Sequence, residues 1–213
     1  AIASVLKTSG VFTGKDAIKS TFLQQSKHAG ILHIASHGIA NDTASGYSFI
    51  AFTSSHAHPD SSRLYARELY NLRLNAAMVV LSACETGVGE KKKGEGVVSL
   101  ARAFAYAGAQ SVISTLWSVN DASTTSIMQE MYKQLRAGAG KSEALQTSKI
   151  SFLERGADDL AAHPYYWSAY IAIGDMQPLY GQRFTLVMLI ALLLMTALVV
   201  GISLKWKKSR AGK

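Results

Sequence analysis

The chain has 213 residues, is 48% hydrophobic and carries a formal net charge of +8. That length allows one domain with a substantial core. Five of the positive charges lie in residues 205–213, which hold no acidic residue, so the other 204 residues carry only +3. The basic balance is therefore weak evidence for nucleic-acid binding, and we expect no nucleic-acid partner.

The hydrophobic pattern predicts alternating helices and strands. In chain order the predicted elements are a helix over 14–27, strands over 30–35 and 48–52, a helix over 65–72, a strand over 76–82, a helix over 96–106, a strand over 111–116, helices over 123–136 and 141–154, and a strand over 167–173. The run "AAMVVLS" is continuously apolar, which is typical of a strand covered on both faces. Short connections between these elements predict an α/β fold with a mostly parallel sheet and helices on both faces.

Residues 184–204 contain 21 consecutive uncharged residues, "FTLVMLIALLLMTALVVGISL". As a helix this segment would span roughly 31 Å, the thickness of a bilayer core. The basic tail 205–213 follows it, with Trp206 at the expected interface. We therefore expect a transmembrane helix over 184–204, a linker over 178–183 and a cytoplasmic tail. The positive-inside rule then places the preceding domain outside the cytoplasm, in a periplasmic location, with a tail-anchored cytoplasmic domain as the alternative.

Two predicted strands end at residues that can do chemistry. His37 ends "LHIASH", and Cys84, the only cysteine, follows "MVVLSA". In an open parallel sheet, sites form at the carboxyl ends of the strands, so neighbouring strands would bring the imidazole and the thiol together. An imidazole near a thiol raises the thiolate fraction and later protonates a leaving amine. The backbone amides of Gly38 and Cys84 would be suited to an oxyanion hole. A buried, inert cysteine and a structural histidine stay open as the alternative.

Other polar motifs have simpler interpretations. His33 points to the same side as His37 but further inside, and we interpret it either as a hydrogen-bonded core histidine or as one that supports the site from behind. The "HAHPD" motif at 56–60 lacks a fourth ligand, so we expect a polar loop and no metal. The "GVGEKKKGEG" stretch matches neither phosphate-loop pattern, so no nucleotide or other cofactor is expected.

Four blocks together resemble the CHAT domain, a cysteine peptidase family related to caspases and separase. They are "ILHIASHG", "VVLSACETGVG", "GEGVVSLARAFAYAGAQSVISTLWSVNDAST" and "YYWSAYIAIGD". The resemblance covers about Gly10 to Asp175. It implies a caspase-like α/β/α sandwich with a His–Cys dyad, in which His37 matches the catalytic histidine, Cys84 the nucleophile and Gly38 the oxyanion glycine. It also implies helical repeats, similar to tetratricopeptide repeats, upstream of Ala1, and we expect a fragment or processed chain because it begins without Met.

The segment "LWSVND" resembles the "LWDVTD" block of separase, which helps to form a pocket for a basic P1 side chain. Ser118 stands where separase has its first Asp, and Asp121 keeps the second. One pocket carboxylate would favour Arg or Lys at P1. The alternative is that Asp121 caps the helix that follows it.

We therefore expect a cysteine endopeptidase domain over residues 1–177, anchored in the membrane and acting on proteins or peptides. Its rival is a catalytically silent CHAT-like interaction or signalling module, anchored in the same way.

Overall fold

The protein is described from a computed structural model. The description covers residues 2–6, 10–39, 41, 44–54, 59–82, 95–155, 161–179 and 192–196, without the side chains of 59–60 and 95–99. The chain divides into two compact units, Ala1–Leu179 and Tyr180–Lys213. Within the described ranges there is no helix both long and apolar enough to cross a membrane. Of the span predicted over 184–204, only 192–196 are described, and they are helical.

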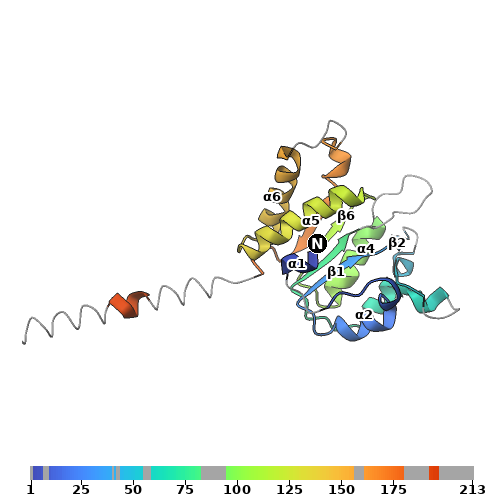
Figure 1. Ribbon diagram of the computed structural model, residues 1–213. Helices are drawn as coiled ribbons and strands as arrows, with labels where there is room; N and C mark the ends of the chain where they lie inside the picture. Colours follow the sequence, from blue (N-terminus) through green and yellow to red (C-terminus); the bar gives the residue numbers. More distant parts are fainter. Residues whose placement is uncertain are drawn as a thin grey trace, which may run out of the picture. The chain divides into compact units, whose positions relative to one another are not determined.

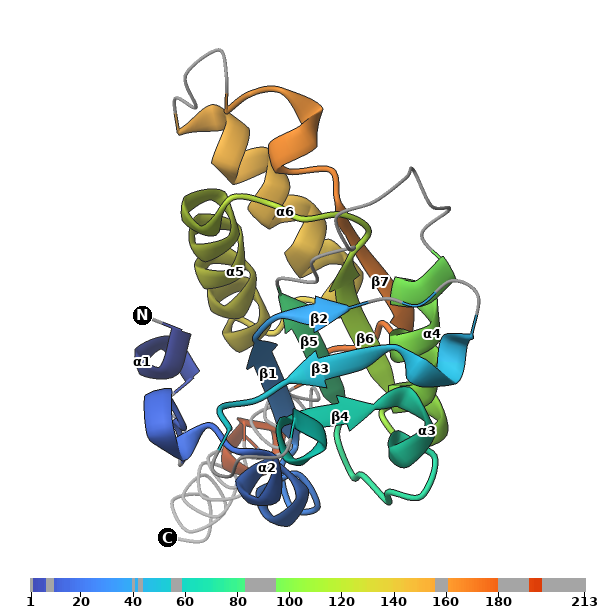
Figure 2. The same ribbon diagram turned by 90° about the vertical axis from the view of Figure 1, so that its right-hand side faces the viewer.

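The main sheet has four strands in the order β1-β5-β6-β7; Figure 1 labels β1 and β6, and Figure 2 labels all four. They are β1 (Ile31–Ala35), β5 (Met78–Ser82), β6 (Ser111–Thr115) and β7 (Tyr170–Gly174). The first three are parallel, and β7 pairs antiparallel with β6. The prediction of a mostly parallel sheet is confirmed, and the two strands that end near His37 and Cys84 are neighbours.

A second, smaller sheet of three antiparallel strands crosses in front of the main sheet in Figure 2. It contains β2 (Gly38–Ile39), β3 (Phe49–Ala51) and β4 (Arg63–Tyr65). The strand predicted over 48–52 exists as β3, but it belongs to this separate sheet. Strands of two or three residues are too short to show an alternating pattern, which is why β2 and β4 were not predicted from the sequence.

The helices cover both faces of the main sheet. They are α1 (Ile2–Leu6), α2 (Lys19–Gln25), α3 (Ala66–Leu69), α4 (Glu95–Tyr106), α5 (Asp121–Arg136) and α6 (Lys141–Glu154), with short 3-10 turns at Gly14–Asp16, Ser45–Tyr47, Pro59–Ser62 and Pro164–Tyr166. The helix predicted over 14–27 is a 3-10 turn followed by α2. A salt bridge of 2.6 Å from Lys19 to Glu68 joins α2 to α3.

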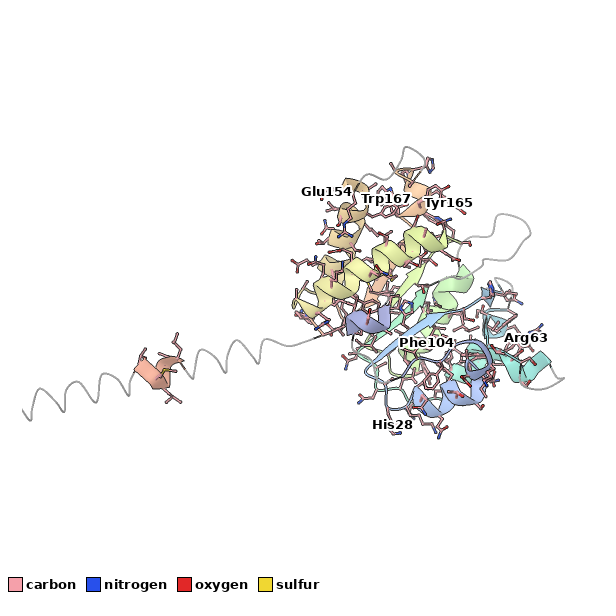
Figure 3. All side chains as sticks on the ribbon, in the orientation of Figure 1. His28, Arg63, Phe104, Glu154, Tyr165 and Trp167 are labelled. Atoms are coloured by element: carbon pink, nitrogen blue, oxygen red, sulfur yellow. The ribbon has the colours of Figure 1, made fainter. Side chains whose placement is uncertain are left out.

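Two hydrophobic clusters lie on opposite faces of the sheet. Val79, Leu81 and Val112 face α2, α3 and α4 in the first, together with Phe104. Figure 3 labels Phe104 within this half of the domain. The second cluster joins Met78, Val80 and Ile113 to α1, α5, α6 and β7. Because successive strand residues point to opposite faces, burial on both sides explains the continuous apolar run Met78–Leu81 of β5. β6 is buried on both sides as well, although only Val112 and Ile113 of its residues are apolar.

The turn after α4 requires a glycine. Gly108 has φ = 110°, and a Cβ there would lie 2.4 Å from the carbonyl oxygen of Leu74. Left-handed backbone and close packing against a neighbouring carbonyl both exclude a larger residue. This turn leads the chain from α4 into β6.

The end of β7 is bonded to the start of α6. The Lys141 side chain, only 1% exposed, donates to the carbonyl oxygen of Asp175 at 3.0 Å and lies 3.5 Å from its carboxylate. The backbone N–H of Lys141 donates to the carbonyl of Met176 at 2.9 Å. We call these contacts the Lys141 clamp; they fix the chain at the point where it leaves the sheet.

Candidate active site at the carboxyl ends of the strands

The strands β1 and β5 end side by side. Their register pairs Ala35 with Ser82, the last residue of each strand. His37 lies two residues beyond Ala35, and Cys84 lies two residues beyond Ser82 in the sequence. Cys84 and the loop that follows it lie outside the described residues. The strand ends that lead to both residues are thus in matching register.

The small sheet fixes the backbone around His37. The N–H of Ala51 donates to the carbonyl of His37 at 2.7 Å, and the hydroxyl of Ser36 donates to the carbonyl of Ala51. Gly38 is buried and pairs with Ile50 across β2 and β3, whereas the His37 side chain is exposed. The imidazole is therefore presented to solvent from a backbone that two sheets hold in place.

A polar cluster lies beneath the strand ends, on the face covered by α5. The ring Nδ1 of His33 lies 2.9 Å from the hydroxyl of Tyr132, and its Nε2 lies 3.0 Å from the hydroxyl of Ser82. Tyr132 and Ser82 are 0% and 2% exposed. We call these three side chains the His33 cluster. The prediction that His33 is a hydrogen-bonded core histidine is confirmed.

Burial decides the protonation of the His33 cluster. It lowers the pKa of His33 to about 4, because the charged imidazolium loses its hydration. It also raises the pKa of Tyr132 far above its ordinary value. At neutral pH the imidazole is therefore uncharged, with one ring nitrogen donating and the other accepting. Both neighbouring hydroxyls can rotate to suit either tautomer.

The start of α5 differs from the capping expectation. Asn120 is the N-cap residue, and its side-chain oxygen accepts from the N–H of Ala122 at 2.8 Å and that of Ser123 at 3.4 Å. The interpretation of Asp121 as the cap is wrong, because the helix begins at Asp121 itself, one residue earlier than that role requires. Asp121 is the first helical residue and is exposed, as is Ser118.

Aromatic side chains stand beside this segment. The ring of Trp117 stacks on Tyr165, with centroids 6.2 Å apart and planes inclined by 24°. Its indole N–H donates to the carbonyl of Tyr165 at 2.9 Å. Tyr165 and Trp167 lie at one end of the domain in Figure 3. These contacts hold the strand-to-helix turn that carries Ser118 and Asp121.

Two residues that bond to His33 were missed by sequence reasoning. Ser82 was assigned to an apolar strand and Tyr132 to an ordinary helix face, yet both bond to His33. A serine closing an otherwise apolar run was a usable signal for Ser82. His56 and His58 of the rejected metal motif, like Lys91–Lys93, fall outside the described residues.

The sheet, its helices and its strand ends together define the fold class of the protein. A mostly parallel sheet, covered by helices on both faces and with functional residues expected at its carboxyl edge, fits a caspase-like α/β fold. A sequence profile of the CHAT domain matches residues 1–175. The chain therefore belongs to the CHAT domain family.

The matches to individual proteins cover a shorter part of the chain than the family match does. Tetratricopeptide repeat protein 28 of Mus musculus is 33% identical over 116 residues, which are 53% of this chain and 4% of that protein. Its Homo sapiens counterpart is 31% identical over 113 residues, with the same two shares. The chain thus spans a small part of the length of these relatives.

Proposed function

We propose that the chain is a cysteine endopeptidase with Cys84 as nucleophile and His37 as the proton-transfer group. The observation that carries this proposal is the register of β1 and β5, which pairs Ala35 with Ser82. Each reactive residue follows its member of that pair by two positions in the sequence. Membership of the CHAT family, which is related to caspase-like peptidases, supports the same chemistry.

The reaction follows from these groups. His37 takes the proton of the Cys84 thiol, and the thiolate sulfur bonds to the scissile carbonyl carbon. The carbonyl oxygen becomes an oxyanion held by the N–H groups of Gly38 and Cys84. When the C–N bond breaks, the imidazolium protonates the amine that leaves. His37 then takes a proton from water, whose oxygen attacks the thioester and releases the acid and the thiol.

A basic P1 residue is the preferred substrate feature. Asp121 and Ser118 are exposed where β6 passes into α5, at the carboxyl edge that also ends β1 and β5. A carboxylate at this edge would attract an arginine or lysine side chain. With a single pocket acid, the preference is expected to be less strict than with two.

The test combines labelling with cleavage. The protein is treated with an Arg-P1 chloromethyl ketone, with adduct formation read by mass spectrometry, and with a degenerate peptide library. An adduct on Cys84 and cleavage after Arg or Lys, both absent from Cys84→Ala, support the proposal. If no P1 residue gives an adduct or cleavage, the domain is the catalytically silent CHAT-like module.

The environment of the domain is part of the proposal. Residues 184–204 are proposed to anchor the chain in a membrane, with 205–213 in the cytoplasm and the peptidase domain on the other side. The uncharged run and the basic flank support this assignment. Protease treatment of spheroplasts, whose periplasmic face is open to the enzyme, tests it, with lysed spheroplasts as control: degradation of the domain only after lysis would reverse the orientation.

Repeats upstream of Ala1 are the last part of the proposal. The two relatives are named for tetratricopeptide repeats, which supports such a region in the full-length protein. Sequencing the coding region before Ala1 tests this. The absence of a helical repeat there would contradict it.

A further inference from the structure

We propose that His33 is a positioning residue that fixes the carboxyl ends of β1 and β5 relative to α5. This inference rests on the proposed peptidase function, since it assigns the residue that holds His37 and the approach to Cys84 in working geometry. His33 contacts neither substrate nor reacting atoms in this role. It acts through Ser82 and Tyr132.

The cluster joins three elements through one side chain. His33 lies in β1, four residues before His37 in the sequence. Ser82 ends β5, 3.0 Å from His33 Nε2, and Tyr132 belongs to α5, 2.9 Å from Nδ1. The rings of His33 and Tyr132 are also in contact, with centroids 5.7 Å apart. Of the three elements linked in this way, β1 leads to His37, β5 leads to Cys84 and α5 begins at Asp121.

Backbone pairing alone does not fix α5. Parallel hydrogen bonds hold β1 to β5. Apart from Tyr132, the described contacts of α5 with the main sheet are apolar packing and a Tyr170–Thr124 bond to β7, while Glu130 and Arg136 bond to Arg155 after α6 and to the carbonyl of Val5 in α1. Apolar contacts are non-directional and tolerate small shifts of a helix across a sheet. A hydrogen bond to each ring nitrogen sets both distance and angle. His33 thereby gives the helix a defined position over the ends of β1 and β5.

Stability alone gives little reason for such a cluster. Buried hydrogen bonds contribute little net free energy compared with apolar groups of the same shape, whereas each unpaired member would be costly. Three apolar side chains would serve a purely structural role as well. The hydrogen bonds of the His33 cluster are directional, and the cluster lies in the strands that lead to His37 and Cys84. The precise geometry that catalysis requires explains such a cluster better than stability does.

Two conservative variants remove one hydrogen bond each. Tyr132→Phe keeps the ring and removes the hydroxyl bonded to Nδ1, and Ser82→Ala removes the hydroxyl bonded to Nε2. Ser111→Ala is the matched control, because Ser111 is a buried strand serine whose hydroxyl donates to the carbonyl of Ala77 at 2.8 Å, at the opposite end of the sheet. Circular dichroism and Tm establish that each variant is folded.

The readout is the reactivity of the single cysteine. Alkylation by iodoacetamide over pH 5–9 reports the ionisation of Cys84 alone, and peptide hydrolysis gives kcat and KM. In Tyr132→Phe and Ser82→Ala we expect the midpoint of the alkylation profile to move toward that of an ordinary thiol, and kcat to fall about tenfold with KM nearly unchanged. Ser111→Ala should leave both unchanged.

His37→Ala separates the two possible failures. If His37→Ala does not change the alkylation profile, the proposed dyad is wrong, and with it the peptidase function. If His37→Ala changes the profile but Tyr132→Phe and Ser82→Ala match Ser111→Ala, the dyad stands and the positioning role of His33 is overturned. A shift in both cluster variants, smaller than that in His37→Ala, supports the role.

Discussion

Acid should destabilise the folded protein through His33. In the unfolded chain His33 takes up a proton near pH 6.5, whereas in the folded protein its pKa is about 4. Between these values the unfolded state binds more protons, so stability falls as pH falls. The contribution of His33 is fully present above pH 6.5 and is lost as pH falls through about 4. Most of this pH range, from about 6.5 down to about 4, lies above the pH at which ordinary carboxylates take up protons.

The size of the effect follows from the shift in pKa. Each unit corresponds to about 1.4 kcal/mol, so the loss between pH 7.5 and pH 5 is about 2 kcal/mol. Urea unfolding of the full chain at a series of pH values gives the free energy of unfolding directly. His33→Gln removes the titrating group while keeping a polar side chain, and should remove this pH-dependent loss even though its stability at pH 7.5 is lower.

The comparison isolates His33 from other acid-sensitive groups. The pKa of Glu130 is lowered, first by hydrogen bonds from Gln134 and Arg155, and that of Asp175 is lowered chiefly by the backbone N–H of Gln177. Both groups therefore also lose stabilising interactions in acid, but at lower pH and equally in both proteins. Equal losses in the wild type and His33→Gln between pH 7.5 and pH 5 would refute the reasoning.

Other predictions concern the cap, the turn, the pocket and the nucleophile. Asn120→Ala should lower the free energy of unfolding by about 1 kcal/mol in urea titrations, because two N–H groups of α5 lose their acceptor. Gly108→Ala should lower it by about 2 kcal/mol or more, because its backbone is left-handed and its Cβ would meet Leu74; an unchanged Tm would contradict this. Asp121→Asn should lower kcat/KM for Arg and Lys at P1 but not for uncharged P1 residues, measured with matched peptides. Cys84→Ala should abolish cleavage without changing the circular dichroism spectrum; retained cleavage would remove Cys84 as nucleophile.

The main sheet could be predicted because its signal is local. Each residue of β5 is buried, and the strand shows as an apolar run in the sequence. β6 is buried along its whole length too, but only Val112 and Ile113 of its residues are apolar. The pairing of β1 with β5 was only a condition of the proposed site, and the structure meets that condition. The small antiparallel sheet escaped prediction because its strands depend on pairing with each other more than on their own pattern.

The His33 cluster could be predicted only in part. A histidine two strand repeats before His37 indicated a bonded core residue, but its partners lie 49 and 99 positions away in the chain. Contacts of that separation leave no periodic trace in one sequence. The prediction of the α5 cap failed for a local reason. Asn120 and Asp121 are adjacent and both residue types suit an N-cap, so a difference of one residue in the helix start decides between them.

The Lys141 clamp has a mechanical consequence. A pull on the chain beyond Leu179 first loads the bonds from Lys141 to Asp175 and Met176, which connect to α6. Because β7 lies directly behind the clamp and pairs along its whole length with β6, that load reaches the sheet as shear along the strands, distributed over several hydrogen bonds. The domain is therefore built to resist tension from its carboxyl-terminal side, and β7, although it is an edge strand, should detach only after the Lys141 clamp has broken in a force measurement made from that end.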